Sequence, residues 1–332
     1  MSLEFDILSD VLDSLRICGN LLLYESYIAP WAIALPDADQ LGRLLGVRPG
    51  TKAVAFHLVE RGHIEVTSEA SSGEPPLIVE AGEMVVFFSG MAHQIAQGTV
   101  KSSLAVERVL AGDEIPFRCA TGGRGVSVAC VCGIFYLHDT HLNPLFASLP
   151  PILHAPVSQA ESFHNLSGVA SLIVQELEKR SPGSDFMVER LLELLCAGAV
   201  RAYMDKVEPQ EASWLTGLRD PIVSRALALI HAQPGYAWSV DALAQHVALS
   251  PSRFAARFKA TLGESPMGYV TKWRLHIASR LLHSTEKNIS KIAIEVGYEN
   301  LAAFNRAFKR HFEVPPGAWR LAQSNAEYSM SR

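Results

Sequence analysis

The sequence predicts an α+β protein in which a sheet-rich N-terminal module precedes a helical segment and an all-α C-terminal module. Three observations lead to this class. Short apolar runs, separated by turn residues such as Gly62, fill residues 21–137 and are typical of antiparallel strands. After Pro150 and Pro151, apolar residues recur at helical spacing. Near the C-terminus, two similar helical segments lie about fifty residues apart.

Length and composition bound the remaining alternatives. The chain has 332 residues, of which 48% are hydrophobic and 19% charged, enough for two or three compact domains. No stretch approaches the roughly 18 apolar residues of a membrane-spanning helix, so we expect no membrane partner. Five cysteines without a CxxC pair fit a reducing compartment. The acidic opening lacks a signal peptide's cationic region, and these features together predict a cytoplasmic protein.

The elements expected along the chain follow from local patterns. A short amphipathic helix is expected over residues 3–17, before the strands. Two further helices are expected over 162–179 and 185–207, joined by a Ser-Pro-Gly-Ser sequence that stops one helix and starts the next. Residues 208–220 resemble a linker, and the rest is helical. We therefore expect domains over residues 1–155, 156–215 and 216–322, with a tail over 323–332.

The charge is distributed unevenly between the two halves. Residues 216–332 contain 15 Lys and Arg against 8 Asp and Glu, a net charge of +7, whereas residues 1–215 carry −12, which together give the chain's −5. Such asymmetry suggests a nucleic-acid-binding segment attached to an acidic module. Two solvated surfaces of opposite charge, without any nucleic-acid partner, would show the same difference in net charge.

The C-terminal module contains an internal repeat. AQHVALSPSRFAARFK, from Ala244, and AIEVGYENLAAFNRAFK, from Ala293, share an alanine, a valine three residues later, a turn, and two phenylalanines four residues apart. The second copy has one extra residue in its turn. Each copy predicts a helix, a tight turn and a second helix, with the alanine as the small residue where the two helices cross.

The second helix of each copy has one apolar and one polar side. Residues at i, i+4 and i+8 form the apolar stripes Phe254, Phe258, Leu262 and Phe304, Phe308, Phe312. The polar side of the second copy suits DNA, because Arg reads guanine, Asn reads adenine and basic residues bind phosphates. We expect Arg306 to contact a base. The DNA-contacting residues predicted in both copies are Ser252, Arg253, Lys259, Ala302, Asn305, Arg306, Lys309 and Arg310.

The whole C-terminal layout resembles the AraC/XylS family of bacterial transcription regulators. The matching parts are the first unit from Ser239 to Leu262, the linker TKWRLHIASRLL, the core IAIEVGY, the segment FNRAFKRHF and the ending VPPGAWR, within residues 221–320. A rigid linker helix could place both recognition helices on one DNA face, about 34 Å apart. The resemblance implies a regulator that binds promoter double-stranded DNA, more often an activator, with RNA polymerase as a partner. A protein-interaction scaffold is the alternative for such helical hairpins.

One departure concerns the first recognition helix. It carries Ala255 and Ala256 where many relatives present long polar side chains. We therefore expect the first helix to read bases less strongly than the second.

The N-terminal module resembles the cupin barrels, which implies a cupin-like antiparallel β-barrel. AGEMVVFFSGMAHQI has the spacing of the second cupin motif, although Phe88 stands where Pro is usual, and the first motif lacks its HxH pair and has Ala55 at the Glu ligand's place. His57, His63 and His93 remain as imidazoles that could converge on an effector pocket. Because a metal centre needs three or more placed ligands, we expect no cofactor.

Two function classes remain open. The segment CGIFYLHDTHLNPLFASLPPILHAP with the helices after it resembles the cupin-type sensor of one AraC subgroup. That resemblance implies an unknown small-molecule effector, or an oxidant, sensed in the barrel, with adjacent helices forming a homodimer. Leu191, Leu194, Leu195 and Val200 could face that partner or belong to the core. The rival is a metal-dependent cupin enzyme, a dioxygenase or isomerase, with an accessory DNA-binding domain; the missing ligands argue against it.

A redox signal is suggested by the cysteines. Cys130 and Cys132 flank Val131, so strand periodicity places both thiols on one face. With Cys18 or Cys119 as a further partner, they could form a reversible redox pair. Buried cysteines in strands are also common as small hydrophobic residues, and the sequence leaves both interpretations open.

Overall fold

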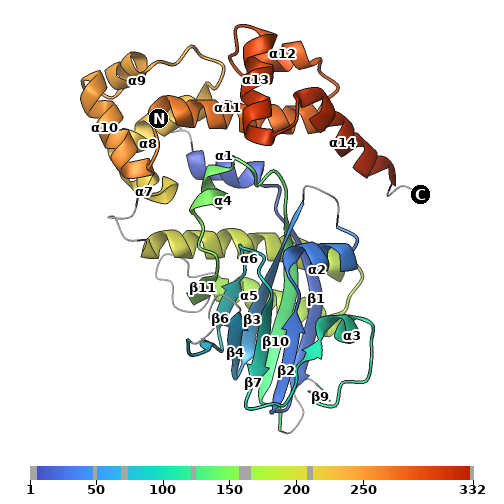
Figure 1. Cartoon of the computed structure of the whole chain (residues 1–332). Helices are drawn as coiled ribbons and strands as arrows, with labels where there is room; N and C mark the ends of the chain where they lie inside the picture. Colours follow the sequence, from blue (N-terminus) through green and yellow to red (C-terminus); the bar gives the residue numbers. More distant parts are fainter. Residues whose placement is uncertain are drawn as a thin grey trace.

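The computed structural model describes residues 6–47, 51–68, 74–120, 125–156, 166–207 and 212–329. Figure 1 shows the sheets at one end of the molecule and the helices α7–α14 at the other, with α1 and α4 between them. The predicted α+β class is confirmed. Residues 1–5 and 162–165, which belong to two of the expected helices, lie outside the described residues.

The strands of the N-terminal module form two sheets. The first has the order β11-β6-β3-β10-β1-β9 and the second β5-β4-β7-β2-β8, and all described pairs are antiparallel except β2 with β8. Their bounds are β1 Cys18–Tyr27, β2 Trp31–Leu35, β3 Lys52–Arg61, β4 His63–Ser68, β5 Leu77–Glu80, β6 Glu83–Val86, β7 His93–Gln97, β8 Leu104–Ala105, β9 Arg118–Cys119, β10 Val128–Leu137 and β11 Leu153–Pro156.

The expected closed barrel is not formed. Among the described strands, no hydrogen-bonded ladder joins the first sheet to the second. The edge strands β8 and β9 have two residues each, too few to carry a ladder across from one sheet to the other. The module is therefore a pair of facing sheets with an apolar core between them.

Strand β10 lies at the centre of the first sheet and is covered on both faces. Cys130, Cys132 and Ile134 belong to the core between the sheets. Val131 and Phe135 belong to a second core under the helices, as the two-residue period of a strand requires. Gly133 is needed within this strand, because a Cβ there would lie 2.5 Å from the Asn20 carbonyl oxygen.

The helices of the N-terminal half lie around the sheets. α5 and α6 form an antiparallel hairpin, and α6 packs against β1. Leu191, Leu195 and Val200 are buried in this packing, whereas Leu194 is 58% exposed, so only one of the four residues considered for a dimer face is available. The helix bounds are α1 Ile7–Ser14, α2 Ala38–Leu44, α3 Val106–Leu110, α4 Pro144–Ser148, α5 Leu166–Lys179 and α6 Ser184–Lys206.

The C-terminal module is all-α, as predicted. The expected linker contains a short helix, α7, whose Trp214 and Leu215 are buried; two apolar residues are too few to show helical spacing in the sequence. No helix in the described ranges is long and apolar enough to cross a membrane. The bounds are α7 Trp214–Arg219, α8 Pro221–Ala232, α9 Val240–His246, α10 Pro251–Leu262, α11 Pro266–Ser284, α12 Ile289–Glu295, α13 Leu301–Phe312 and α14 Pro316–Ser329.

Candidate functional site: nucleic-acid interface and sensor core

The two repeats fold into two equivalent helix-turn-helix units, α9–α10 and α12–α13. In each unit the turn holds one residue in the left-handed region, Ala248 at φ 54° and Gly297 at φ 88°. The next backbone N–H then returns to the crossing alanine: Leu249 N donates to Ala244 O at 3.0 Å, and Tyr298 N donates to Ala293 O at 2.9 Å. The predicted repeat is thus confirmed, and the two units share the same hydrogen bond across the turn.

The phenylalanine stripes make the cores of these units. Phe254 and Phe258 are fully buried in the first unit, as are Phe304 and Phe308 in the second. The Phe308 ring lies 4.3 Å from the Phe312 ring, centroid to centroid. Burying one side of each second helix in this way leaves its opposite side facing outward.

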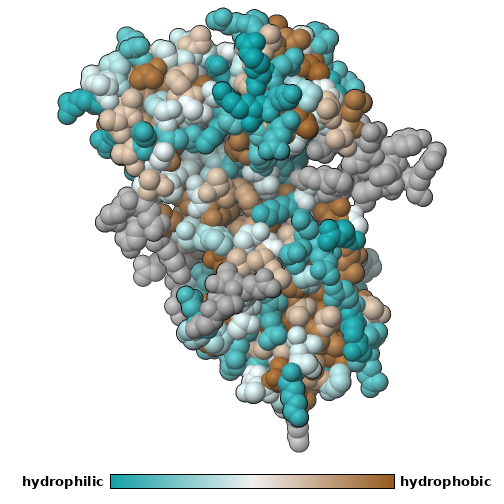
Figure 2. All heavy atoms as spheres, in the orientation of Figure 1, coloured by the Kyte–Doolittle hydropathy of each residue, from teal (hydrophilic) through white to brown (hydrophobic). Residues whose placement is uncertain are grey.

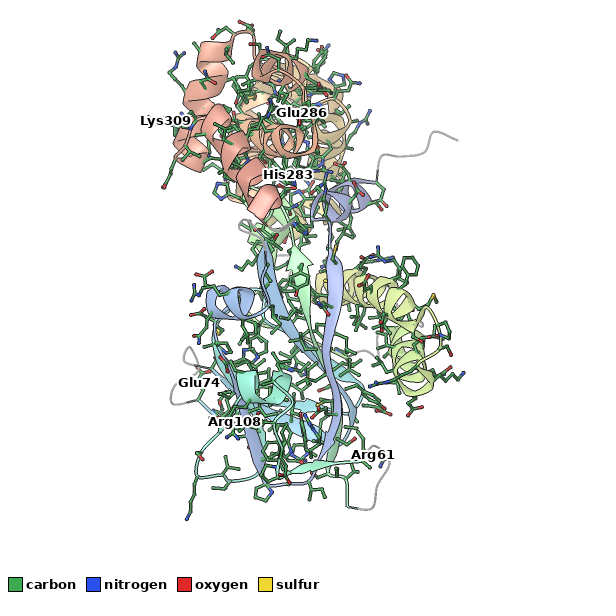
Figure 3. The ribbon with its side chains drawn as sticks, turned by 90° about the vertical axis from the view of Figure 1, so that its right-hand side faces the viewer. Arg61, Glu74, Arg108, His283, Glu286 and Lys309 are labelled. Carbon is green, nitrogen blue, oxygen red and sulfur yellow. The ribbon has the colours of Figure 1, made fainter. Side chains whose placement is uncertain are left out.

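The residues predicted to contact DNA lie on that outward side. All are exposed except Asn305, which is partly buried. Figure 2 shows hydrophilic side chains gathered over the α12–α13 part of the helical module, and Figure 3 shows Lys309 on its outer edge. The geometry leaves Arg306, Lys309 and Arg310 accessible on one helix, which is the arrangement that major-groove reading requires.

Helix α13 has the stronger polar face of the two recognition helices. Its N-cap is Asn300, whose side chain accepts a hydrogen bond from Ala303 N at 2.8 Å. Lys309 and Arg310 occupy the last turn, where positive charge suits the helix dipole. Burial and the neighbouring Arg310 lower the pKa of His311, so the positive charge of this face comes from Arg and Lys.

The core between the sheets contains two buried histidines and two cysteines. His57 Nε2 lies 2.9 Å from His93 Nε2, and His57 Nδ1 lies 3.1 Å from Cys132 Sγ. Cys132 Sγ is 3.7 Å from Cys130 Sγ. Strands β3, β7 and β10 bring these residues together from three parts of the sequence.

The hydrogen-bond partners of His93 determine which ring nitrogens in this cluster donate and which accept. His93 Nδ1 lies 3.1 Å from the Met91 carbonyl oxygen, which can only accept, so His93 donates there and its Nε2 accepts. His57 Nε2 then donates to His93, which leaves His57 Nδ1, beside Cys132 Sγ, without a proton in the neutral ring. Burial lowers the pKa of His93 to about 4 and that of His57 well below its ordinary value, which keeps both rings neutral.

Two predicted site residues lie apart from this cluster. His63 begins β4, whereas β4 meets His93 at Ser68, five residues or roughly 16 Å further along the strand. Cys18 pairs with Tyr136 rather than with Cys132 in the β1–β10 ladder, and burial raises the pKa of its thiol. The structure therefore brings together His57, His93, Cys130 and Cys132.

The space beside this cluster is small. His57 and Cys132 border a cavity of about 10 Å³ whose other walls include Tyr27 and apolar side chains, which is room for a single water molecule. The hydrogen bond with Cys130 and burial raise the pKa of the Cys132 thiol. Among the described residues, no group of three or more His, Cys, Asp or Glu side chains is placed to hold a metal ion.

A buried polar chain joins the two modules, and no pattern of residue types or spacing in the sequence indicates it. Trp214 Nε1 donates to Tyr269 Oη at 2.9 Å, which lies 2.7 Å from His231 Nε2, and His231 Nδ1 lies 2.9 Å from Asp10 Oδ2. Because Asp10 is an acceptor, His231 donates to it and accepts from Tyr269. Helix α1 is thereby bound to α8, α11 and α7.

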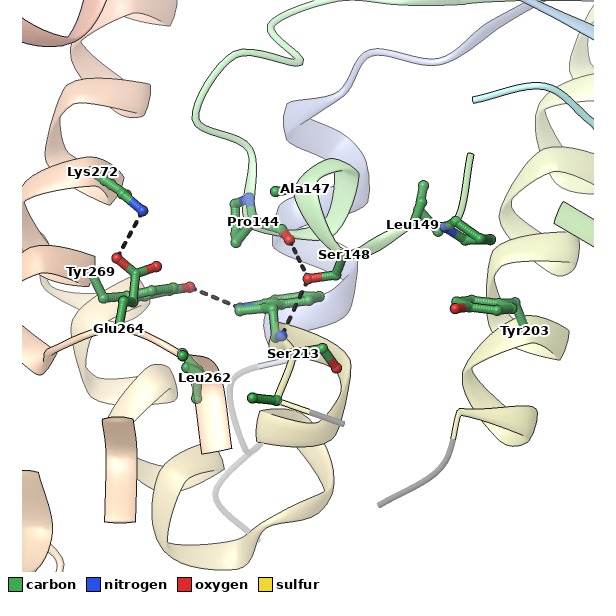
Figure 4. Close-up of a pocket in the computed structure, with 14 residues that line it drawn as sticks. Pro144, Ala147, Ser148, Leu149, Tyr203, Ser213, Leu262, Glu264, Tyr269 and Lys272 are labelled. Atoms are coloured by element: carbon green, nitrogen blue, oxygen red, sulfur yellow. Dashed lines mark hydrogen bonds and ion pairs between the residues drawn. The ribbon is translucent and has the colours of Figure 1, made fainter. Parts of the chain in front are cut away.

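A cavity of about 460 Å³ opens beside this chain, between α4, α7 and α11. Trp214 and Tyr269 line this cavity, and Figure 4 shows Tyr269 near the ion pair between Lys272 and Glu264, whose charged atoms are 2.9 Å apart. In the segment before α4, His141 Nε2 lies 2.9 Å from the His311 carbonyl oxygen of α13. The N-terminal module therefore contacts α8 and α11 through the polar chain from Asp10, and α13 through His141.

The fold and these surfaces define a two-module protein, a sensor-like pair of sheets joined to a double helix-turn-helix. The cupin family model matches residues 6–205, and a helix-turn-helix domain model matches residues 243–322. The chain belongs to the AraC-like transcription regulators whose N-terminal domain is a cupin domain. The predicted resemblance is confirmed for both modules.

Three relatives illustrate the similarity. An AraC-like transcription regulator of Streptomyces lividans is 35% identical over 60% of this chain and 66% of its own length. The regulator AlkR of Acinetobacter baylyi is 28% identical over 95% of this chain and 99% of its own length. The RCS-specific transcriptional activator RclR of Escherichia coli is 30% identical over 58% of this chain and 68% of its own length. All are named as regulators, which supports a regulator over the alternative cupin enzyme.

Proposed function

We propose that this protein binds promoter DNA through α10 and α13 and alters transcription in response to a signal received by its cupin domain. The observation that carries the proposal is the outward face of α13, where Arg306, Lys309 and Arg310 lie opposite a fully buried phenylalanine stripe. Helix α10 repeats the geometry with alanines in the middle of its face, so α13 supplies most of the base reading.

Footprinting on promoter fragments from its own genome tests this proposal. Arg306→Ala should abolish sequence-selective binding, because a good Arg–guanine pair contributes about 1–3 kcal/mol of discrimination. Ser252→Ala should only weaken binding. Equal losses from the two changes would contradict the asymmetry, and a wild-type protein without any selective footprint would refute the proposed function.

The phosphate contribution can be measured separately. Lys309→Ala should weaken binding to all sequences alike and lower the slope of log affinity against log salt by about one. Lys101→Ala removes the same charge from an exposed position in the sheet module and should leave that slope unchanged. A Lys309 variant with an unaltered slope would place this side chain off the phosphate backbone.

We propose that the signal received by the cupin domain is a small molecule or an oxidant, and that an oxidant would act at the cluster of His57, His93, Cys130 and Cys132. Cys130 Sγ and Cys132 Sγ lie 3.7 Å apart, close enough for oxidation to a disulfide, in which the two thiols give two hydrogen atoms to hydrogen peroxide and two waters form. The raised pKa of Cys132 predicts a slow reaction at pH 7. Thiol trapping after a peroxide or hypochlorite series, read beside promoter binding, should show Cys132 protected as binding changes; unreactive thiols throughout would exclude the oxidant.

We also propose a homodimer that acts as an activator and contacts RNA polymerase. Support for the dimer comes from the apolar residues that α5 and α6 leave exposed, Leu172, Phe186, Met187 and Leu194. Support for activation comes from RclR, which is named as an activator. A reporter driven by the footprinted promoter would show the sign of regulation.

A further inference from the structure

The two helix-turn-helix units have separate apolar cores that divide one shared helix. Tyr269, Val270 and Trp273 of α11 belong to the core of the first unit and the sheet module. Leu275, Ala278 and Leu282 of the same helix belong to the core of the second unit. The boundary between the cores falls between Trp273 and Leu275, at Arg274.

Arg274 binds the backbone of both units at this boundary. Its Nε donates to Pro234 O at 2.8 Å and one terminal nitrogen donates to Tyr236 O at 2.6 Å, both in the loop between α8 and α9. The other terminal nitrogen donates to Gly297 O at 3.1 Å, in the turn of the second unit. One guanidinium thus binds three carbonyl groups outside the helices, two in the loop that leads into the first unit and one in the turn of the second.

The backbones of the two units also touch directly beneath this side chain. A Cβ at Gly235 would lie 2.6 Å from the Glu295 carbonyl oxygen, and a Cβ at Gly297 would lie 2.7 Å from the Arg274 guanidinium. Gly297 is therefore doubly constrained, by its φ of 88° and by this contact. Glycine at both positions lets the first unit's loop and the second unit's turn approach to backbone distance.

We propose that Arg274 is a positioning residue that sets the distance and relative rotation of the two recognition helices, and so determines the half-site spacing that the protein accepts on DNA. The inference rests on the proposed DNA-binding function. Because the two cores are separate, α11 and the Arg274 contacts are what join the units directly to each other. Two helices on one DNA face must match a helical turn of about 34 Å, so a small rotation shifts one helix off its groove.

The test uses the full-length protein and three DNA probes. The first probe carries both half-sites at the footprinted spacing, the second has two base pairs inserted between them, and the third has only the half-site bound by α13. Arg274→Leu should bind the first probe about tenfold more weakly than wild type, bind the third within twofold of wild type, and lose most of the wild-type preference for the first probe over the second.

Two further variants keep the proposal falsifiable if Arg274→Leu folds poorly. Arg274→Lys keeps the charge but cannot reach three carbonyls in a fixed fork, so it should show an intermediate spacing preference. Gly235→Ala leaves Arg274 in place but wedges the units apart, and it should relax the preference in the same way. Arg225→Leu, which removes a cation from an exposed position on α8, is the matched control and should keep the wild-type preference.

Each outcome has a distinct meaning. Retention of the spacing preference by both Arg274→Leu and Gly235→Ala would overturn the positioning role. Equal losses on the single half-site and the double site would also overturn it, because Arg274 would then act on stability or on DNA contact in general. A wild-type protein that binds none of the probes selectively would instead refute the proposed function itself.

Discussion

Lowering the pH should destabilise this protein through its buried neutral histidines. Burial lowers the pKa of His93 and of His276 to about 4, against an ordinary value of 6.5. The folded state binds these protons less readily than the unfolded state, so stability is complete above pH 6.5 and falls as the pH drops toward 4. Because pH 5 lies about 1.5 pH units below the ordinary pKa and above the folded one, each histidine should cost about 2 kcal/mol of stability at pH 5.

The contribution of His276 can be isolated because its ring is fully buried between α11 and the sheet module. His276 Nε2 lies 3.1 Å from Ser14 Oγ of α1. His276→Gln cannot be protonated in this range, so the stability lost between pH 7.5 and pH 5 should shrink by about 2 kcal/mol relative to wild type. Urea titrations followed by tryptophan fluorescence give the free energy of unfolding of both proteins at both pH values. Because wild type and variant contain the same carboxylates, the contribution of these groups cancels when the two proteins are compared.

Gln245, exposed on α9, provides a control because its side chain carries no titrating group. Gln245→Ala should leave the difference between the two pH values unchanged. If His276→Gln also left it unchanged, the reasoning from burial to protonation would be refuted for this site.

Two other predictions concern packing and assembly. Phe308→Ala removes a fully buried ring from between Phe304 and Phe312 and should lower the free energy of unfolding by about 3–5 kcal/mol. A urea titration would show this as a lower midpoint. A change under 1 kcal/mol would show that the core of the second unit is loosely packed. Leu194→Glu places a charge on the exposed side of α6 and should convert the proposed dimer to a monomer in sedimentation, and an unaltered mass would place the dimer contact elsewhere.

The sequence predicted the features that depend on local spacing. The repeat, both phenylalanine stripes and the outward position of Arg306 follow from a period of 3.6 residues, which tertiary contacts preserved. The closure of the barrel failed because it depends on edge strands β8 and β9, which are only two residues long. A run of two residues carries no alternation from which its length or pairing could be read.

Contacts between distant segments could not be predicted in the same way. Asp10 and His231 are 221 residues apart, and neither residue type nor spacing pairs them. The meeting of His57 with Cys132 depends on the register of β3 against β10, which places the two residues directly opposite. His63 follows His57 in the remnant of the first cupin motif, which is why the sequence suggests that they converge with His93, but the β4–β7 register separates His63 from His93.

The two recognition helices are anchored to the rest of the molecule in different ways. One continuous core runs from Phe135 in the sheet module through Val11 of α1 to Phe254 of the first unit. The second unit has its own core and reaches the first through α11 and Arg274. A displacement in the sheet module would therefore carry α10 with it, whereas α13, which bears Arg306, would follow only as far as α11, Arg274 and the His141 contact transmit the movement. Helix α13, which has the richer base-reading face, thus belongs to the unit whose core is separate from the core of the sheet module.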